Sequence, residues 1–534
     1  MNNVNIDKKK VEYYMKKKNV DWWVVIPTLL LILFISINLI TNPEISKGII
    51  DKIYNITIDK FGWLYMLACI SAFGLLLWVT FSGYGEVKLG KIEDKPEHNE
   101  FEWASMLFCS GVGAGVVILG FMEPIYYLQS PPFGIQAFST EAYEYAHMYG
   151  QFHWGPSAWA FYIPAIVAVG MMVYKKNEPA LKMSVVTKYT IKGKVSKPVG
   201  RIIDVFVQFG IIAGISTSLG LGVPVVSLLI AQTFNIPNDM KLKIVIIFLW
   251  IAMFTISVFR GLEKGIKKLS NINMALVFIF SIFVLFACGI GDIFSMEINS
   301  VGLYFQKFIR MNTWGDPFGD GSFQKMWTIF YWGWWLAFMP LMALFIVKIS
   351  KGRTLKRVIW MQLIWGSLGC WTCFMIYGGY SLKIHQSGRL NLVDMLNTQG
   401  QDVTILELIK TMPMSMLSLV VFCILIFVFL ATCIDSAAYV LASGSAENLE
   451  IDEQPSRFSR VFWAGILAVL SISLLVINQL KAVQTMSLIA GLPLAIFQIY
   501  MCYASIKFLK DYKHKTGVFE EEKNASEEVR ESLL

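Results

Sequence analysis

Charged residues are scarce in this chain. Asp, Glu, Lys and Arg make up 16% of its 534 residues, whereas hydrophobic residues make up 55%. A soluble domain carries about 25% charged residues, so this composition excludes an ordinary soluble protein and predicts an integral membrane protein. The net charge is +8, but the basic residues lie in short segments between apolar runs. Because no basic stripe is present, we expect no nucleic-acid partner.

Signatures of metal, redox and nucleotide sites are also scarce. The eight cysteines lie in apolar stretches, and the single C-x-x-C spacing, Cys370 to Cys373, has no second pair or histidine nearby. That pattern favours buried thiols over a metal or redox centre. The glycine triplet "GVGAG" at 111–115 lacks the sixth-position glycine and the strand context of a dinucleotide loop. His147 and His153 are isolated, so the sequence predicts no cofactor, no metal and no enzyme.

Long apolar runs recur along almost the whole chain. A membrane span needs about 20 predominantly apolar residues. Twelve segments fit: 22–41, 63–82, 104–128, 151–174, 203–232, 243–259, 274–292, 325–349, 357–378, 416–441, 461–477 and 485–508. We therefore expect an all-α membrane protein with a twelve-span domain at 22–510, an N-terminal segment at 1–21 and a charged C-terminal tail at 511–534.

The distribution of Lys and Arg predicts the orientation. Basic residues gather before the first span, after the fourth span and after the eighth span, all on one side of a twelve-span chain. The loop 129–150, on the other side, has none. Because Lys and Arg concentrate in cytoplasmic loops, we expect both termini to be cytoplasmic in a multi-pass protein of the cell inner (cytoplasmic) membrane.

Two spans carry residues that interrupt helices. The third contains Gly111, Gly113 and Gly115, and the eighth contains "WGWWLAFMP", which ends at Pro340. They are five spans apart, as expected for two five-helix repeats formed by spans 3–7 and 8–12. Secondary transporters bind substrate at such interruptions in inverted repeats. The alternative for each glycine is close packing of helices through small residues.

Aromatic residues gather in the same spans. Trp334 and Trp335 lie in the eighth span, Trp154 and Trp159 in the fourth, and Tyr126 near the end of the third. Rings of this kind can hold a quaternary ammonium group through cation–π attraction of about 0.5–2 kcal/mol per contact. The alternative for any single Trp is packing in the core or at the membrane interface, and packing is the default for Trp332.

The residues near the three glycines of the third span indicate the charge of the substrate. A substrate with net positive charge would call for a buried carboxylate, yet none lies among the glycines, and Glu123 is further along the chain. This favours a zwitterion such as a betaine over choline. The carboxylate of the zwitterion could meet backbone N–H groups freed near the glycines.

Several longer motifs carry a family resemblance. The segments "FHWGPSAW", "FYWGWWLAFMP", "KISKGRT", "GLEKGIKKLSN" and "TCIDSA" resemble those of the betaine/choline/carnitine transporter (BCCT) family, and the resemblance extends over roughly residues 20–510. It implies a LeuT-type fold with two inverted five-helix repeats after two additional helices, assembly as a homotrimer in the lipid bilayer, and alternating access around a tryptophan box.

The resemblance also implies roles for single residues. Four residues resemble those of the family's tryptophan box: Tyr126, Trp154, Trp334 and Trp335. The substrate site would also include Gly111, Gly113, Gly115 and Met342. Three further aromatic residues resemble those on the family's access path: Trp159, Tyr162 and Phe338. Choline carriers of the family have an aspartate where this chain has Gly115, which agrees with a zwitterionic substrate.

At the first sodium site of sodium-coupled members, the matching positions are Ile211 and Ile215. These side chains cannot coordinate a hard cation, which binds oxygen. Met342 falls where sodium-independent carnitine/γ-butyrobetaine exchangers have a methionine. The resemblance at this site therefore points away from sodium coupling.

The second sodium site is altered as well. Thr432, Cys433 and Asp435 lie where coupled members carry "TSADS", so one hydroxyl has become a thiol. Lys267 aligns with an arginine of the exchangers and could replace the cation there, or it could be a lysine that snorkels to the cytoplasmic side. We expect sodium-independent exchange of zwitterionic quaternary ammonium compounds, such as carnitine for γ-butyrobetaine. The alternatives are a sodium-coupled glycine betaine symporter for osmoprotection and a membrane sensor that does not transport.

Overall fold

A computed structural model describes residues 20–178, 182–191, 196–260, 262–447, 449, 453–477 and 480–516. The predicted segment 1–21 and tail 511–534 therefore lie largely outside the described residues. Every regular element of the described part is helical, apart from the isolated bridges Val20–Ala446 and Lys88–Thr354. An all-α fold was the expectation from the sequence, and it is confirmed.

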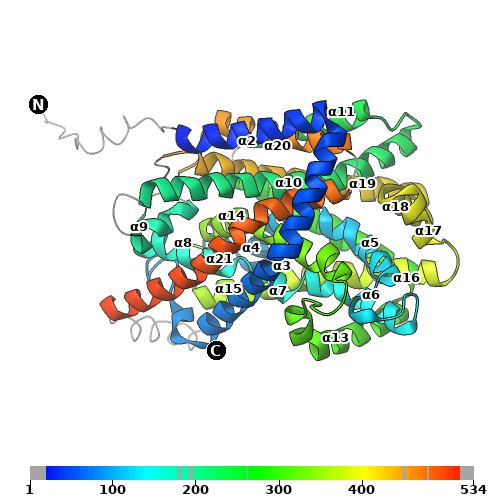
Figure 1. Ribbon diagram of the computed structural model, residues 1–534, viewed down its shortest axis with the longest axis horizontal. Coiled ribbons are helices and arrows are strands. Elements are labelled where there is room, and N and C mark those ends of the chain that lie inside the picture. Colours follow the sequence, from blue (N-terminus) through cyan, green and yellow to red (C-terminus); the bar gives the residue numbers. More distant parts are fainter. Residues whose placement is uncertain are drawn as a thin grey trace, which may run out of the picture.

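Nine of the long helices in the described part of the chain form the frame of the molecule (Figure 1). They are α2 (Trp22–Thr41), α3 (Pro43–Phe81), α10 (Ser196–Phe234), α11 (Met240–Arg260), α12 (Leu262–Cys288), α14 (Ile329–Ile349), α19 (Ser415–Gly444), α20 (Arg457–Ile477) and α21 (Leu480–Thr516). Three further predicted spans are interrupted: α4 (Glu100–Gly111) with α5 (Gly115–Gln129); α6 (Thr140–His153), α7 (Pro156–Ala160) and α8 (Ile163–Lys175); and α15 (Leu355–Cys373), the π-helical turn η5 (Phe374–Gly378) and α16 (Gly379–Gln386).

Length and composition identify the helices that can cross a membrane. Among the described residues ten helices meet both criteria, or eleven when the bent pair α4 and α5 counts as one span. Each of the twelve predicted ranges overlaps a helix, α11 included, but the count of twelve spans stays a prediction. The predicted span 274–292 is too long, because α12 ends at Cys288 and Gly289 turns the chain with a φ of 102°.

Helix α14 lies at the centre of this bundle (Figure 1). Its most apolar window, within Gln324–Ile349, is completely buried. A helix that is hydrophobic on every side must be surrounded by other elements, and α3, α8, α10 and α21 pack around α14. The aromatic motif of the eighth predicted span is therefore in the core of the protein, with no face toward lipid.

The basic loops meet at one end of the bundle. Lys175 Nζ donates to the carbonyl of Gly90 at 3.2 Å, Lys88 bridges to Thr354, and Asp21 lies 3.4 Å from Arg201. The last turns of α21 reach the same end, where the ammonium of Lys513 lies 5.6 Å from the centre of the Tyr84 ring. Both ends of the described chain thus lie on the side of the basic loops.

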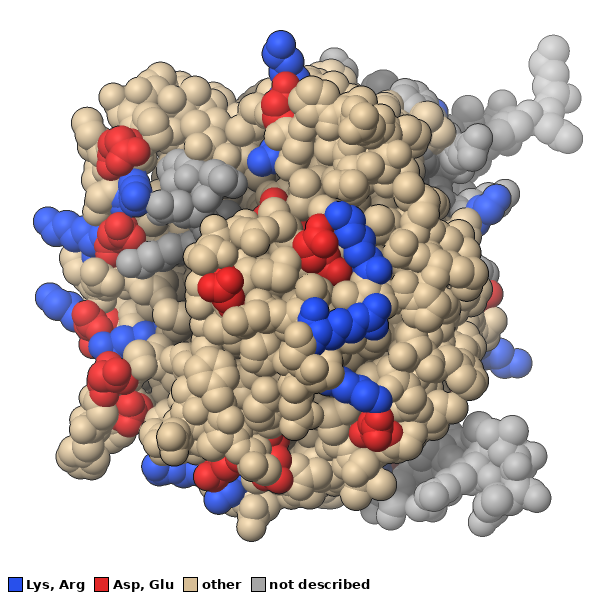
Figure 2. All heavy atoms as spheres, turned by 90° about the vertical axis from the view of Figure 1, so that its right-hand side faces the viewer, with Lys and Arg blue, Asp and Glu red and all other residues tan. Residues whose placement is uncertain are grey.

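The other end carries short helices. They are α17 (Leu392–Gln399) and α18 (Gln401–Lys410), beside the start of α6 (Figure 1). Figure 2 looks onto this end, where basic and acidic side chains lie next to each other instead of gathering by sign. The predicted orientation, which rests on the positions of Lys and Arg in the loops, stays a prediction.

Helix α13 (Ile290–Thr313) was missed by the search for apolar runs, because it is amphipathic. It packs along α6 through two polar contacts. The Oγ of Ser300 lies 2.6 Å from Nδ1 of His147, and Gln151 Nε2 donates to Glu297 Oε2 at 2.6 Å. Helix α13 therefore braces the helix that ends at the aromatic cluster described below.

Glu297 should make stability depend on pH. It lies on α13, outside the candidate spans, and burial raises its pKa from about 4.5 to about 7. A raised carboxyl pKa means that the neutral form is favoured in the folded protein, so this contribution is complete below about pH 4.5 and is lost as the pH rises through 7. Thermal unfolding in detergent should show a melting temperature that falls over this range. The Glu297→Gln variant should show a flatter profile; equal slopes in both proteins would contradict this assignment.

Candidate functional site

The third predicted span is broken where its glycines lie. Helices α4 and α5 meet at an angle of 60°, with residues 112–114 between them. Gly113 has a φ of +59°, and a Cβ added there would lie 2.8 Å from Sγ of Cys433. Both the left-handed conformation and the close thiol require glycine, so the expected interruption of this span is confirmed.

The eighth predicted span has no matching break. Helix α14 continues through Pro340, and only the preceding π-helical turn η4 (Gln324–Thr328) departs from α-helical geometry. Pro340 therefore does not end the helix, and a distortion at this position stays a prediction, since proline lacks the N–H that would bond to the preceding turn. Gly333 serves close packing instead: a Cβ on Gly491 of α21 would lie 2.7 Å from the carbonyl oxygen of Gly333.

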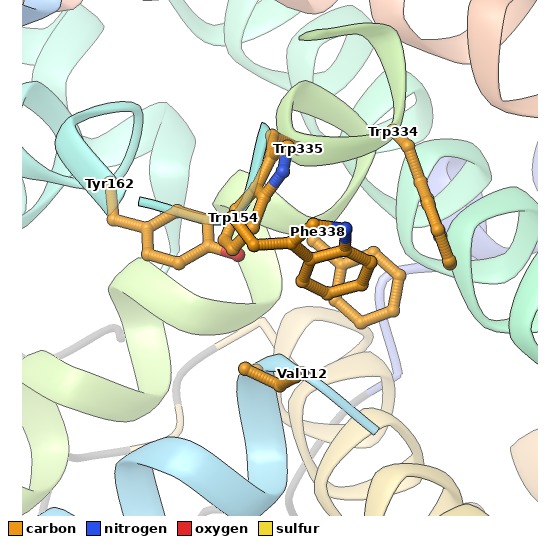
Figure 3. A pocket seen from close by; sticks show the side chains of 7 residues that line it. Val112, Trp154, Tyr162, Trp334, Trp335 and Phe338 are labelled. Carbon is orange, nitrogen blue, oxygen red and sulfur yellow. The ribbon is translucent and has the colours of Figure 1, made fainter. Parts of the chain in front are cut away.

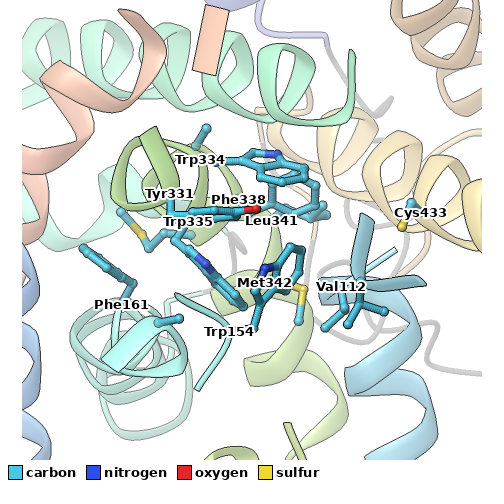
Figure 4. Close-up of a cluster of buried hydrophobic side chains, with 14 of the residues drawn as sticks. Val112, Trp154, Phe161, Tyr331, Trp334, Trp335, Phe338, Leu341, Met342 and Cys433 are labelled. Carbon is cyan, nitrogen blue, oxygen red and sulfur yellow. The ribbon is translucent and has the colours of Figure 1, made fainter. Parts of the chain in front are cut away.

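Three tryptophans face one another at the centre of the bundle (Figures 3 and 4). The ring centre of Trp154 lies 5.8 Å from that of Trp334 and 5.7 Å from that of Trp335, at interplanar angles of 82° and 74°. The indole N–H of Trp334 donates to the carbonyl of Gly214 at 3.3 Å, and that of Trp335 to the carbonyl of His153 at 3.0 Å. These bonds fix both rings of α14, so the sequence motif becomes two sides of an aromatic box.

The cavity between the rings is small. It has a volume of about 10 Å³ and is lined by Gly111, Val112, Trp154, Tyr162, Trp334, Trp335 and Phe338. This is room for about one water molecule, so the rings must move apart to admit a trimethylammonium group. A Cβ at Gly115 would lie 3.1 Å from Cη2 of Trp334 and 3.3 Å from Cη2 of Trp154. Glycine there leaves the edges of both rings free to face the break.

The predicted access-path residues lie beside the box. The ring centres of Trp159 and Tyr162 lie 5.4 Å and 5.5 Å from that of Trp335, and the centre of Phe338 lies 6.2 Å from that of Trp334. The hydroxyl of Tyr162 is buried and has no hydrogen-bond partner among the described residues. Since Tyr162 lines the cavity, this hydroxyl is a free hydrogen-bond donor for a ligand.

Tyr126 lies apart from the other predicted box residues. Its ring centre is 5.0 Å from that of Trp327, and its hydroxyl donates to Gln401 Oε1 at 3.4 Å. It lines a separate cavity of about 460 Å³ near α18, which Lys243 and Asp402 also line. Tyr126 thus lines this larger cavity, at the end opposite to the basic loops, and not the small cavity between the tryptophans.

Tyr331 occupies the side of the box toward Tyr126, and sequence reasoning missed it. Its ring centre lies 5.7 Å from that of Trp154 and 6.1 Å from that of Trp334. A signal was available, because Tyr331 precedes Trp334 by three positions and so shares its helix face. Trp332, by contrast, packs 5.4 Å from both Phe152 and Phe161 and keeps its structural assignment.

A buried carboxylate adjoins the box. Oε1 of Glu123 accepts the indole N–H of Trp154 at 3.0 Å and the hydroxyl of Tyr331, and Oε2 accepts the hydroxyl of Tyr127 at 2.6 Å. The expectation of a box without a carboxylate nearby is therefore wrong. Sequence reasoning looked only among the glycines, whereas Glu123 lies two helical turns further along α5.

The positions predicted for the first cation site are apolar. Ile211 and Ile215 are buried on α10, which leaves no oxygen from either side chain. Met342 lies against the break: its Cε would be 2.6 Å from a Cβ on Gly111 (Figure 4). Within the described residues no group of three or more His, Cys, Asp and Glu side chains is placed to hold a metal ion.

At the second cation site, the donors have partners within the protein. The hydroxyl of Thr432 donates to the carbonyl of Val428 at 2.9 Å, and the thiol of Cys433 to the carbonyl of Cys109 at 3.6 Å. All eight cysteines are free thiols, as expected. Lys267 belongs to α12, but its side chain lies outside the described residues.

Asp435 forms an ion pair that the sequence did not reveal. Arg460 Nη2 of α20 donates to Asp435 Oδ1 at 2.9 Å, and the two side chains are 1% and 2% exposed. The guanidinium carbon also lies 5.8 Å from the centre of the Tyr439 ring and 6.0 Å from that of Phe254. A permanent cation is therefore already bound to the carboxylate of this region.

Comparisons with known proteins agree with the motifs. Residues 23–514 match the family described as "BCCT, betaine/carnitine/choline family transporter". A protein of Acinetobacter baumannii named "Carnitine transporter" is 32% identical over 448 residues, which are 84% of this chain and 80% of the relative. An Escherichia coli protein named "Uncharacterized transporter YeaV" is 29% identical over 443 residues, which are 83% and 92%.

One solved structure has a backbone that is partly similar to that of this chain. It is described as the substrate-bound outward-open state of a Na+-coupled sialic acid symporter, and it aligns over 83% of this chain and 86% of that chain. The TM-score is 0.43 at 14% sequence identity, which is too low for any argument about fold or coupling.

The break should fail when Gly113 gains a side chain. Gly113→Ala forces a left-handed conformation that costs about 1–2 kcal/mol in an L-residue, and its Cβ meets Cys433. We expect a lower melting temperature in detergent. Gly465→Ala on α20 is the matched control, since no atom lies within 4 Å of its added Cβ and alanine favours a helix by about 1 kcal/mol. Equal melting temperatures for the two variants would rule out this role of Gly113.

Proposed function

The chain belongs to the betaine/carnitine/choline family of transporters, and on that premise we propose that it exchanges zwitterionic quaternary ammonium compounds across the cell inner membrane without sodium. The substrates are of the carnitine, γ-butyrobetaine or glycine betaine type, with one compound leaving as another enters. The relative from Acinetobacter baumannii named as a carnitine transporter supports this class.

The arrangement of Trp154, Trp334 and Trp335 carries the proposal. Two rings stand nearly perpendicular to Trp154 with ring centres less than 6 Å away, so opening by a small movement creates three walls around one point. A quaternary ammonium group donates no ordinary hydrogen bond and is held by ring faces, each worth about 0.5–2 kcal/mol. The box therefore binds the trimethylammonium end that all these substrates share.

The carboxylate end has donors within reach. The hydroxyl of Tyr162 lacks a partner among the described residues, and the backbone at 113–115 turns between α4 and α5. Backbone N–H groups at a helix start attract anions. A zwitterion would then lie with its ammonium group between the tryptophans and its carboxylate toward Tyr162 and the start of α5.

Several features support independence from sodium. Ile211 and Ile215 offer no oxygen, and Na+, like other hard cations, binds oxygen ligands. The carboxylate of Asp435 is paired with Arg460, whose guanidinium stays charged at any physiological pH. Arg460 therefore supplies at this position the positive charge that a bound sodium ion would otherwise supply. The sodium-coupled symporter for osmoprotection, in contrast, requires Asp435 to exchange this partner for an ion.

Alternating access follows from the two cavities. The small cavity lies between the rings, and Tyr126 and Gln401, which are hydrogen-bonded to each other, both line the cavity of about 460 Å³. Opening of this contact would admit substrate from the end opposite to the basic loops. Opening on the side of α4 would release it toward the basic loops, which we assign to the cytoplasm.

The finer architecture is part of the proposal. It comprises twelve spans in residues 22–510, a LeuT-type fold with inverted repeats of spans 3–7 and 8–12, cytoplasmic segments at 1–21 and 511–534, and a homotrimer. The location of both described chain ends beside the basic loops supports an even number of spans. Because a break separates α4 from α5 whereas α14 is continuous, the two repeats would differ in detail.

Transport in proteoliposomes tests the proposal directly. Uptake of labelled carnitine or γ-butyrobetaine should require an unlabelled betaine inside, and it should persist without sodium and without a membrane potential. The control is the same vesicle preparation without protein. Strict dependence on an inward sodium gradient would favour the symporter, and binding without any flux would favour a sensor.

Trp335→Leu tests the box. The substitution removes one wall, so the affinity for γ-butyrobetaine should fall by at least about tenfold, which corresponds to about 1.4 kcal/mol. Trp63→Leu is the matched control, because Trp63 is 63% exposed on the outside of α3. Binding is measured by calorimetry in detergent, with melting temperatures to confirm folding. An unchanged affinity in a folded Trp335→Leu protein would count against the box.

A further inference from the structure

Glu123 is completely buried and lies directly behind one wall of the box. Its side chain is 0% exposed. The indole N–H of Trp154 and the hydroxyl of Tyr331 both point at Oε1, and the hydroxyl of Tyr127 points at Oε2. Two of these three donors, Trp154 and Tyr331, belong to rings whose centres lie 5.7 Å apart at the box.

The pattern of donors fits a negatively charged carboxylate. An indole N–H can only donate, so Oε1 must accept from Trp154. The Tyr127 oxygen is also 2.9 Å from His153 Nδ1, and His153 Nε2 is 3.0 Å from the hydroxyl of Thr328. If Tyr127 donates to Glu123 and accepts from His153 Nδ1–H, then His153 Nε2 accepts from Thr328. Every group is satisfied with Glu123 ionised and His153 neutral.

This charge has no counterion within the described part of the chain. Glu123 forms no ion pair there, and the buried guanidinium of Arg460 is used by Asp435 instead. A buried ion costs several kcal/mol unless hydrogen bonds and an opposite charge compensate. Three donors supply the first requirement. No described residue supplies the second, and the adjoining space is the cavity of the box, where a cationic ligand would supply it.

Trp154 connects the carboxylate with that cavity. Its N–H edge bonds to Glu123, while its opposite edge, Cη2, lies 3.3 Å from the Cβ position of Gly115 at the break. The anion is thus one ring away from the cavity, in an interior where Coulomb attraction is weakly screened. A hydrogen bond to an anion also polarises the donor, which makes the face of the indole more negative toward a cation.

We propose that Glu123 is the counter-charge of the aromatic box and determines its preference for a cationic headgroup over an uncharged one of the same shape; this inference rests on the proposed function. Glu123 acts through Trp154 and Tyr331 and does not touch the substrate. The zwitterion then binds with its positive end toward Glu123 and with its carboxylate toward Tyr162 and the start of α5, away from Glu123.

The test compares two ligands that differ only in charge at the headgroup. One is γ-butyrobetaine, and the other is its carbon isostere, in which a tert-butyl group replaces the trimethylammonium group. Wild-type protein should bind the betaine at least about tenfold more tightly. Glu123→Gln keeps an oxygen for Trp154 but loses the charge, so the ratio of the two affinities should fall by at least about threefold, while the ring faces retain the rest of the preference. Glu297→Gln, the same change on α13, should leave the ratio at its wild-type value.

The outcomes separate the two levels of the proposal. A wild-type protein that binds no betaine at all contradicts the proposed function. Wild-type binding of the betaine with an unchanged ratio in Glu123→Gln overturns only the role of Glu123, and so does an equal loss of affinity for both ligands, which indicates a structural effect. If Glu123→Gln does not fold, Glu123→Asp replaces it: the charge is kept, so the ratio should stay within about threefold of wild type, and a collapse of the ratio overturns the inference.

Discussion

The angles between the rings at the centre of this protein depend on where three buried indole N–H groups find their acceptors. An unpaired backbone or side-chain polar group in the membrane core costs several kcal/mol. The indole N–H groups of Trp334 and Trp335 are therefore bonded to the carbonyls of Gly214 and His153, and that of Trp154 to Glu123. The three acceptors lie on different helices, α10, α6 and α5. The hydrogen bonds to them therefore also set the angles between the rings.

Buried charge follows the same constraint by two different routes. Asp435 has its counterion within the chain, since Arg460 is contributed by the next helix. Glu123 has hydrogen-bond donors but no cation of its own among the described residues. A carboxylate that is paired internally is fixed, whereas one that is compensated by hydrogen bonds alone remains sensitive to a charged ligand. Asp435 thus stabilises the packing of the helices, whereas Glu123 interacts with the charge of the substrate.

The sequence predicted those parts of the site that depend on neighbouring residues. The break at Gly113, the helical motif around Trp334 and the grouping of basic loops all follow from short patterns. What it could not predict depends on distant partners: Glu123 meets Tyr331 across 208 positions, and Asp435 meets Arg460 on another helix. Helix α13 was missed because its apolar residues form one stripe instead of a run. The ring of Tyr126 packs against Trp327, and the ring of Tyr331 packs against Trp154 of the box.

The close approach of Gly333 and Gly491 has a mechanical consequence. At this crossing the backbones of α14 and α21 approach without a side chain of either glycine between them, which favours movement of the two helices as one rigid unit. Relative motion in the core is then left to the opposite side, where Gly113 provides a joint between α4 and α5. Trp334 and Trp335 belong to α14 and would keep their positions. The cavity between them would then change its size when α4 and α5 move relative to α14.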